Sequence, residues 1–472
     1  MCEPSAKLCQ VRTQTNLSTM TYNMFQRAAL LAALAATTLV STNVQAANRT
    51  WSSTAGAVGF WQTSAAWVGG VAPVAGDDLL FNVAPVAGGT RNVTNDFVPN
   101  TQFNSISLIN AYVLYGNTIN LAGNVTNNGS AAVATVNLNS ALQQNSTWFV
   151  GASNGRIDVN GDISGAFDFI KSGSGSVRLQ TGTKTYSGNT VVDAGTLDLN
   201  IANALPSGAG KGNVNITAGA TLGLRFSQNI NGLNGGGNVT TLSSGTKTLT
   251  LGNNDANAVF NGSLNQGSGA LALVKTGNGE QILNGSSIYS GTTTVNSGRL
   301  IFNNTSSTNT ITVSANGSLG GVGVILGTTI VFGKLDAGAS AGSIGTLSFN
   351  LPGTGLSLDS ASTTIFQLDR TAGQNSDLLS VNGQLSLGGT WNVSNIGTAL
   401  IAGDLFDLFN ATTVVGAVGT LNLPSLDLGL GWDTTLFPTS GVISVVSVPE
   451  PSSMAIVGIS GLAMLAMKRR KA

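Results

Sequence analysis

The sequence predicts an all-β chain whose middle part is a stacked β-solenoid. Segments of four to seven residues alternate apolar with small polar side chains and end at Gly, Asn or Ser, as in Val133–Asn139 and Thr248–Leu251. This period of two indicates strands with one buried face. Glycine supplies 62 of the 472 residues, about twice its ordinary usage, and only 8% of residues are charged. These observations indicate turn-rich β-structure with enough apolar residues for a core.

The composition excludes several classes of function. The chain contains no histidine, so it has no imidazole base, no Ser-His-Asp or Cys-His nucleophile pair, and no histidine ligand for zinc or iron. Apolar residues make up 42% of the chain, which argues against a disordered tail. Residues 47–447 hold 13 basic and 18 acidic side chains, a thinly spread net charge of −5. Because no basic stripe is present to neutralise phosphates, nucleic-acid binding is not expected.

Residues 1–23 are interpreted as a mis-called start that precedes Met24. This segment contains both cysteines of the chain, Cys2 and Cys9. The mature protein would then contain no cysteine, and disulfides would not brace it even in an oxidising compartment.

Residues 24–47 are predicted to be a secretory signal peptide. One basic residue, Arg27, precedes the apolar run 28–40, and small residues follow up to a cleavage site between Ala46 and Ala47. The apolar run is too short for a stable membrane span and is typical of a signal-peptide core. The expected partners are the Sec translocon and signal peptidase.

Residues 48–160 are predicted to form an N-terminal β region that caps the solenoid. Aromatic residues gather between Trp51 and Tyr115, whereas the middle of the chain has few. Large aromatic side chains can cover the open end of a stack of coils. A sugar-stacking surface is the alternative interpretation of the same residues.

Residues 161–330 are predicted to be the β-solenoid, because one motif occurs there twice, at about 166–200 and 270–303. The spacing between the two copies shortens by a single position between the lysines and the tyrosines. A unit of this size cannot bury its own apolar face, so stacking on neighbouring units is expected. The residues that define the motif are Lys171, Gly173, Gly175, Tyr186, Gly188 and Gly195 in the first copy and Lys275, Gly277, Gly279, Tyr289, Gly291 and Gly298 in the second.

These two segments resemble the autotransporter-associated β-strand repeat. The resemblance implies a right-handed parallel β-helix, with Val, Leu and Ile inside and Gly and Asn at the bends. At about 20 to 30 residues per coil, we expect of the order of fifteen to twenty coils. The stretch around Trp61, Trp67 and Asp77 is similar to one that often precedes such repeats.

Residues 331–447 are predicted to form a C-terminal β region that covers the last coil. Ser376–Leu379, Gly403–Phe409 and Gly431–Asp433 resemble the closing segment of proteins that carry a PEP-CTERM tail. A cover is needed because an open end of a solenoid exposes bare strand edges.

Residues 448–472 resemble the PEP-CTERM sorting signal of Gram-negative bacteria. The triplet Pro449, Glu450 and Pro451 is followed by the apolar stretch Met454–Met467 and by the basic cluster Lys468–Lys471. The resemblance implies a single transmembrane helix in the inner membrane and an exosortase that processes the tail near the triplet. Whether the tail is cleaved or retained stays open, and the basic end is expected in the cytoplasm.

Possible reactive sites in the chain have simpler explanations. Gly338–Gly342 matches a Gly-x-Ser-x-Gly elbow but has no histidine base, and Gly208–Gly212 lacks the Ser or Thr of a phosphate loop. Carboxylates alone can serve in β-helix lyases, and calcium can bind them adventitiously, but aspartate is also an ordinary turn former. No catalytic residue, cofactor or metal site is therefore predicted. The carboxylate pairs considered are Asp77 with Asp78, Asp193 with Asp198, and Asp404 with Asp407.

The sequence as a whole predicts an exported, exosortase-sorted structural or adhesin-like protein of the cell surface or extracellular matrix, not an enzyme. Extracellular polysaccharide or other cells are the expected partners. A carbohydrate-active β-helix enzyme, of the lyase or glycosidase kind, is one alternative. An autotransporter-type passenger is the other.

Overall fold

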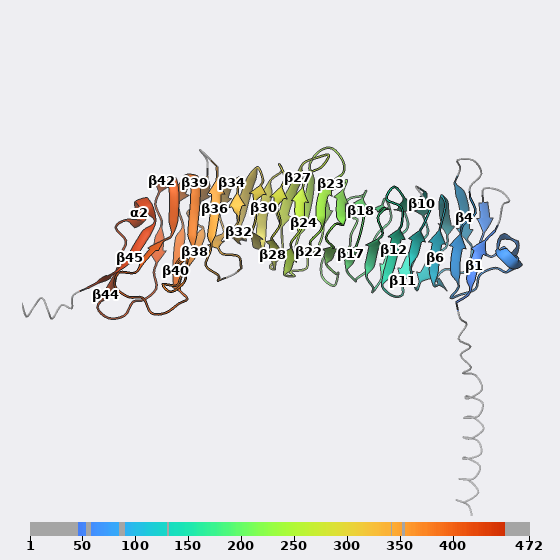
Figure 1. Ribbon diagram of the computed structural model, residues 1–472, viewed down its shortest axis with the longest axis horizontal. Helices are drawn as coiled ribbons and strands as arrows, with labels where there is room; N and C mark the ends of the chain where they lie inside the picture. Colours follow the sequence, from blue (N-terminus) through green and yellow to red (C-terminus); the bar gives the residue numbers. More distant parts are fainter. Residues whose placement is uncertain are drawn as a thin grey trace, which may run out of the picture. The chain divides into compact units, whose positions relative to one another are not determined.

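The computed structural model describes residues 46–52, 58–84, 90–129, 132–340, 342–351 and 355–448. The chain divides into two compact units, Met1–Ala47 and Asn48–Ala472. Of the first unit only residues 46 and 47 are described, and they form no regular element. The described part of the second unit is a stack of β-coils (Figure 1). The coils contribute strands in a fixed order to three columns, and strands that pair within a column are parallel.

The first column contains the strands that open each coil, together with the second halves of β30 (Thr293–Phe302) and β32 (Thr310–Gly321). Its other strands are β1 (Asn48–Trp51), β3 (Asp78–Phe81), β6 (Ser105–Leu108), β9 (Val125–Asn127), β12 (Ser146–Val150), β15 (Phe169–Ser172), β17 (Thr190–Val192), β19 (Val214–Ile216), β22 (Leu233–Gly235), β25 (Ala258–Phe260), β28 (Glu280–Leu283), β35 (Lys334–Ala337), β38 (Thr363–Leu368), β40 (Thr390–Asn395) and β43 (Thr420–Asn422).

The second column follows the first around a corner and includes the first halves of β39 (Leu378–Leu387) and β42 (Phe409–Gly416). Its other strands are β2 (Val58–Phe60), β4 (Arg91–Asn95), β7 (Tyr112–Gly116), β10 (Val133–Val136), β13 (Arg156–Val159), β16 (Ser176–Leu179), β18 (Thr196–Leu199), β20 (Thr221–Leu224), β23 (Asn238–Thr241), β26 (Ser263–Asn265), β29 (Ser287–Ile288), β31 (Ser306–Ser307), β33 (Val324–Ile325) and β36 (Thr346–Asn350).

The third column closes each coil and is the least continuous. It takes the first halves of β30 and β32 and the second halves of β39 and β42, which run from one face to the next without a break. Its other strands are β5 (Thr101–Phe103), β8 (Ile119–Leu121), β11 (Ser140–Leu142), β14 (Ile163–Gly165), β21 (Gln228–Asn229), β24 (Lys247–Leu251), β27 (Leu271–Lys275), β34 (Thr328–Val331) and β37 (Leu356–Leu358).

The register of the second column gives the length of a coil. Val133 pairs with Arg156, Arg156 with Ser176 and Ser176 with Thr196, so the first of these coils is longer than the next two. The first column contains seventeen strands among the described residues, counting β30 and β32. The long parallel sheet and the near absence of helix confirm the prediction of an all-β chain and are consistent with a β-solenoid. The columns run through positions 160 and 330, and the domain boundaries placed there stay predictions.

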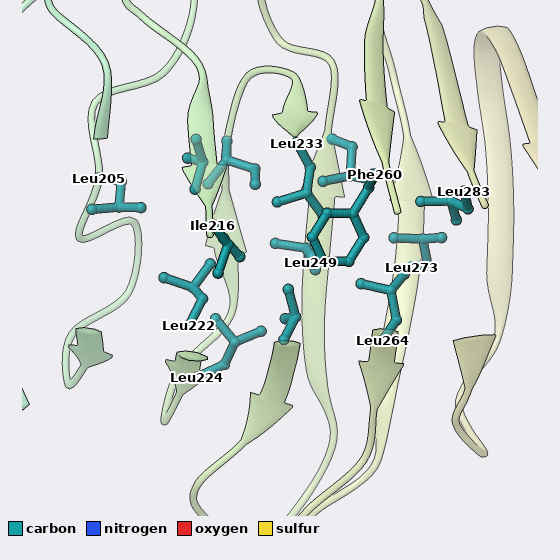
Figure 2. Packing of buried hydrophobic residues seen from close by; sticks show 14 of the residues in the cluster. Leu205, Ile216, Leu222, Leu224, Leu233, Leu249, Phe260, Leu264, Leu273 and Leu283 are labelled. Carbon is teal, nitrogen blue, oxygen red and sulfur yellow. The ribbon is translucent and has the colours of Figure 1, made fainter. Parts of the chain in front are cut away.

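The core lies inside the stack of coils and is built from aliphatic side chains. Leu197, Leu222, Val239 and Leu264 occupy one register position of four successive coils and are at most 1% exposed. Figure 2 shows Leu222 and Leu264 among the side chains that fill the interior between the strands. Each strand turns every second side chain toward this core. The buried positions therefore follow the alternation of apolar and polar residues seen in the sequence.

Aromatic residues close the N-terminal end of the solenoid. The rings of Trp51 and Trp67 meet at 5.1 Å, and those of Trp61 and Phe103 at 5.5 Å. The three tryptophans are at most 2% exposed, so the structure uses them for packing and leaves no indole face of theirs free for stacking on a sugar. The short 3-10 turns η1 (Ser64–Ala66) and η2 (Val68–Gly70) lie in this region.

A small antiparallel sheet covers the C-terminal end. It consists of β41 (Leu405–Asp407), β45 (Val442–Ser447) and β44 (Leu430–Asp433), with β45 in the middle. The helix α2 (Phe437–Ser440) places Phe437 against Trp391, with ring centroids 5.4 Å apart. This sheet and helix are called the C-terminal cap below.

Candidate functional site

The first copy of the repeat motif forms a corner held by a buried lysine. Lys171 stands near the end of β15 and is 0% exposed. Its Nζ donates to the carbonyl oxygens of Ser172, Gly173 and Ala194, each at 2.8 Å. Burial lowers the pKa of Lys171 to about 8. The ammonium group thus joins one corner to the corner of the next coil.

The second copy reproduces this arrangement. Lys275 ends β27 and is also 0% exposed. Its Nζ donates to the carbonyl oxygens of Thr276, Gly277 and Ser297, at 2.6, 3.0 and 3.3 Å. Burial lowers the pKa of Lys275 to about 8. The acceptors therefore occupy equivalent positions of the motif in both copies: the two residues after the lysine and the residue before the last glycine.

The last glycine of each copy is required by the stacking of corners. Gly195 has φ +66°, and a methyl group on it would overlap the carbonyl oxygens of Gly173 and Gly175 one coil away. Gly298, with φ +65°, meets Gly277 and Gly279 in the same way. A side chain is therefore excluded both by the backbone conformation and by the close approach of two coils.

The tyrosine of the motif is a core residue with a buried partner. The hydroxyl groups of Tyr186 and Thr190 lie 2.5 Å apart, and those of Tyr289 and Thr293 lie 2.7 Å apart. Burial raises the pKa of both tyrosines. The glycines that follow them approach a neighbouring coil, Gly188 at the carbonyl of Phe167 and Gly291 at that of Leu271. The threonine partners were not predicted from the sequence, although both lie four residues after the tyrosine.

The two copies occupy different faces of the solenoid. In the first copy the lysine strand β15 belongs to the first column, whereas β27 of the second copy belongs to the third. In the first column, the residue that is in register with Lys171 five coils later is Leu283. Lys275 precedes Leu283 by about one third of a coil. The motif therefore specifies a corner and not a particular face.

A third buried lysine makes the same kind of corner without the full motif. Nζ of Lys184 donates to the carbonyl oxygens of Gly161, Thr181 and Gly182, at 2.9, 2.7 and 3.1 Å. Burial lowers the pKa of Lys184 to about 8. Lys184 was not among the predicted residues, because its neighbours lack the glycine spacing of the two repeats.

Corner asparagines and aspartates link successive coils in a ladder. The side-chain oxygens of Asn145, Asp168, Asn189 and Asn213 accept the backbone N–H groups of Asp168, Asn189, Asn213 and Gly232, at 2.7 to 3.0 Å. Each side chain satisfies a backbone donor at a bend where the strand hydrogen bonds stop. Much of the Asn and Asp content at the turns thus serves the stacking of coils.

The first two carboxylate pairs do not form reactive pairs. Asp77 is buried and accepts from Nε of Arg49 at 2.7 Å, while Asp78 accepts from Asn104 at 2.7 Å. Asp193 is exposed, whereas Asp198 is 2% exposed and receives two guanidinium groups. The partners of Asp198 are Arg178 at 2.7 Å and Arg225 at 2.9 Å.

In the third pair, Asp404 and Asp407 also have different surroundings and do not form a reactive pair. Asp404 accepts from Nε of Arg370 at 3.0 Å. Burial raises the pKa of Asp407, whose Oδ1 atom is buried without a hydrogen-bond partner. Among the described residues no group of three or more Cys, Asp or Glu side chains is placed to hold a metal ion.

The two glycine-rich segments are turns with their own internal partners. Ser340 is exposed, and its N–H donates to Oγ of Ser343 at 3.1 Å. In the loop Gly208–Gly212 the buried side chain of Asn231 accepts from the N–H of Gly208 at 2.7 Å and donates to three carbonyl oxygens of that loop. The amide of Asn231 therefore occupies the centre that a phosphate would need.

The predicted sorting triplet Pro449, Glu450 and Pro451 lies outside the described residues. The cleavage site at Ala46 and Ala47 stays a prediction. No helix within the described ranges has the length and apolar character needed to cross a bilayer.

Comparison with known proteins identifies three segments of the chain. Residues 169–199 and 273–302 match the family model of the passenger-associated-transport-repeat. Residues 447–471 match that of the PEP-CTERM protein-sorting motif. Among curated proteins, the adhesin BmaC autotransporter of Brucella suis biovar 1 (strain 1330) is 32% identical over 206 residues, which is 40% of this chain and 6% of that protein. The chain thus spans a small part of the length of this relative. It carries two passenger-associated transport repeats in its solenoid and a PEP-CTERM sorting motif after it.

Proposed function

We propose that this chain is an exported structural or adhesin-like protein of the cell surface, sorted by an exosortase through its C-terminal tail. The observation that carries the proposal is the combination of two passenger repeats within the solenoid and a sorting motif at 447–471. The adhesin similarity over 206 residues supports the same function. The signal peptide at 24–47 would direct export, and the apolar stretch Met454–Met467 would hold the chain in the inner membrane until processing.

The chemistry of the solenoid supports a non-enzymatic role. Catalysis by carboxylates needs two or three of them to converge on one substrate bond. Of the aspartates considered above, Asp77, Asp198 and Asp404 are paired with arginines instead, and Asp78 accepts from Asn104. Three of the six lysines between residues 47 and 447 are buried in corners. The outward surface is therefore poor in cations, and a neutral polysaccharide suits it better than an acidic one.

The sorting part of the proposal is tested by changes in the tail. Deleting residues 448–472 should release the protein from the envelope into the medium. Replacing Pro449, Glu450 and Pro451 by alanine, with Met454–Met467 unchanged, should leave an unprocessed protein in the inner membrane. Immunoblots of fractionated cells measure both results. Retention of the deletion variant at the envelope would refute membrane sorting, and normal processing of the triple-alanine variant would refute recognition of the triplet.

A further inference from the structure

The outer face of the antiparallel sheet in the C-terminal cap is apolar near the point where the described chain ends. On the central strand β45, Ile443 and Val445 are at most 1% exposed and face the core, whereas Val446 is 37% exposed. Val448, the next residue after Ser447 at the end of the strand, is 50% exposed. Leu405 pairs with Ser444 and is 55% exposed. The sheet therefore has an ordinary buried face and an outer face on which exposed aliphatic side chains lie beside Ser444 and Asp433.

The loop before β44 adds the most exposed residue of this surface. Leu428 is fully exposed, and the N–H of Val448 donates to the carbonyl oxygen of the adjacent Gly429 at 2.8 Å. Leu428 and Val448 thus lie beside each other at the end of the cap from which the chain leaves. We call Leu405, Leu428, Val446 and Val448 the exit patch.

The tail limits the distance between the exit patch and any bilayer into which the tail inserts. Five residues, 449–453, separate Val448 from Met454. Five extended residues span at most about 18 Å. The headgroup layer on each side of a bilayer is about 5 to 8 Å thick. If Met454–Met467 inserts as the proposed function requires, the exit patch lies no more than about 10 to 13 Å from the headgroup layer, within reach of it.

The charge of the cap restricts the type of surface. Residues 396–448 contain four aspartates and no lysine or arginine. Exposed aliphatic side chains enter a lipid interface, whereas acidic groups are repelled by anionic headgroups. The patch therefore suits a zwitterionic lipid surface.

We propose that the exit patch docks on the outer face of the lipid bilayer and holds the cap against the membrane while the tail is inserted. This inference rests on the proposed function, because the tail brings the cap to the bilayer. The docked cap would orient the solenoid and the linker 449–453 for processing.

The experiment places single labels on the full chain with Cys2 and Cys9 replaced by serine. An environment-sensitive fluorophore is attached to Leu428→Cys or Val446→Cys, and to Val259→Cys as a control. Val259 is 41% exposed on β25, in the middle of the solenoid. The protein is reconstituted into phosphatidylcholine vesicles that carry a nitroxide quencher near the headgroup. All three positions are exposed, so the variants should fold, and circular dichroism verifies this.

We expect quenching at positions 428 and 446 to exceed that at 259 several-fold, and to decrease when phosphatidylglycerol is added. Equal, weak quenching at the three positions would overturn the docking. Protection of label 428 without vesicles would also overturn it, because the tail or a second copy would then cover the patch. Co-flotation of protein with vesicles is measured in the same sample. Failure to float would refute tail insertion, whereas flotation with weak quenching would refute only the docking.

Discussion

Replacing Gly195 by alanine is expected to destabilise the solenoid far more than the same replacement at Gly219. Both glycines have positive φ, +66° and +87°. A methyl group on Gly195 would overlap two carbonyl oxygens of the neighbouring coil, whereas a methyl group on Gly219 meets nothing within 4 Å. The pair therefore separates the cost of the backbone conformation from the cost of pushing two coils apart.

The expected losses of stability follow from these two costs. An alanine in the left-handed region costs about 1 to 2 kcal/mol, and that is the whole effect expected for Gly219→Ala. At Gly195 the overlapping atoms belong to the backbone and cannot rotate away. Overpacking in a tightly packed interior adds about 1 to 3 kcal/mol. We therefore expect a total of about 2 to 5 kcal/mol for Gly195→Ala.

Urea denaturation followed by circular dichroism at several wavelengths measures the difference. Because a solenoid can lose coils locally, the midpoint of unfolding is compared together with hydrogen exchange at the amides of β16 and β18. If Gly195→Ala shifts the midpoint no more than Gly219→Ala does, the overlap with the neighbouring coil carries no cost in stability. An equal loss of protection along the whole solenoid would refute the local origin of the effect.

Other changes test the buried polar groups. Lys171→Met should cost about 2 to 5 kcal/mol, because leaving three buried carbonyls without a donor costs about 1 to 3 kcal/mol each and removal of a buried charge returns part of this. Lys334→Met at an exposed site is the control, and equal midpoints would contradict the corner model. Tyr289→Phe should cost about 1 to 2 kcal/mol through the lost bond to Thr293, and adding Thr293→Val should cost less than the sum of the two single changes in a double-mutant cycle. Burial raises the pKa of Asp377 to about 7, so the native state holds a proton that the unfolded state has released between about pH 4 and 7, and stability should fall by up to about 4 kcal/mol as pH rises through this window. Asp377→Asn should remove that slope, and an unchanged pH profile would show that the carboxyl titrates normally.

The strands were predictable because their cause is local. In each alternating segment, such as Thr248–Leu251, the apolar positions themselves indicate which side chains face the core. The repeat glycines were found for the same reason, since a bend with positive φ admits few other residues. The face on which each strand lies was not predictable. It depends on the summed length of all preceding coils, and these lengths vary from coil to coil.

Contacts between coils could not be predicted from the sequence either. The sequence around Lys184 does not match that around Lys171, because the two local acceptors of Lys184, Thr181 and Gly182, precede it, whereas those of Lys171 follow it. The ladder from Asn145 to Asn213 has steps of 21 to 24 residues, without a constant period that a search could detect. The unequal coil lengths, which make the face of each strand unpredictable, therefore make these hydrogen-bond partners unpredictable as well.

The rotation of the repeat from one face to another bears on its function. A ligand-binding motif must present its side chains on a common surface, or at least expose them. The lysines and tyrosines of both copies are at most 1% exposed, and the copies begin in different columns. A ligand that contacted one copy would meet a different face at the other. The shared positions of the motif therefore serve the stacking of corners, and any adhesive specificity must come from the variable outward residues between them or from the two ends of the solenoid.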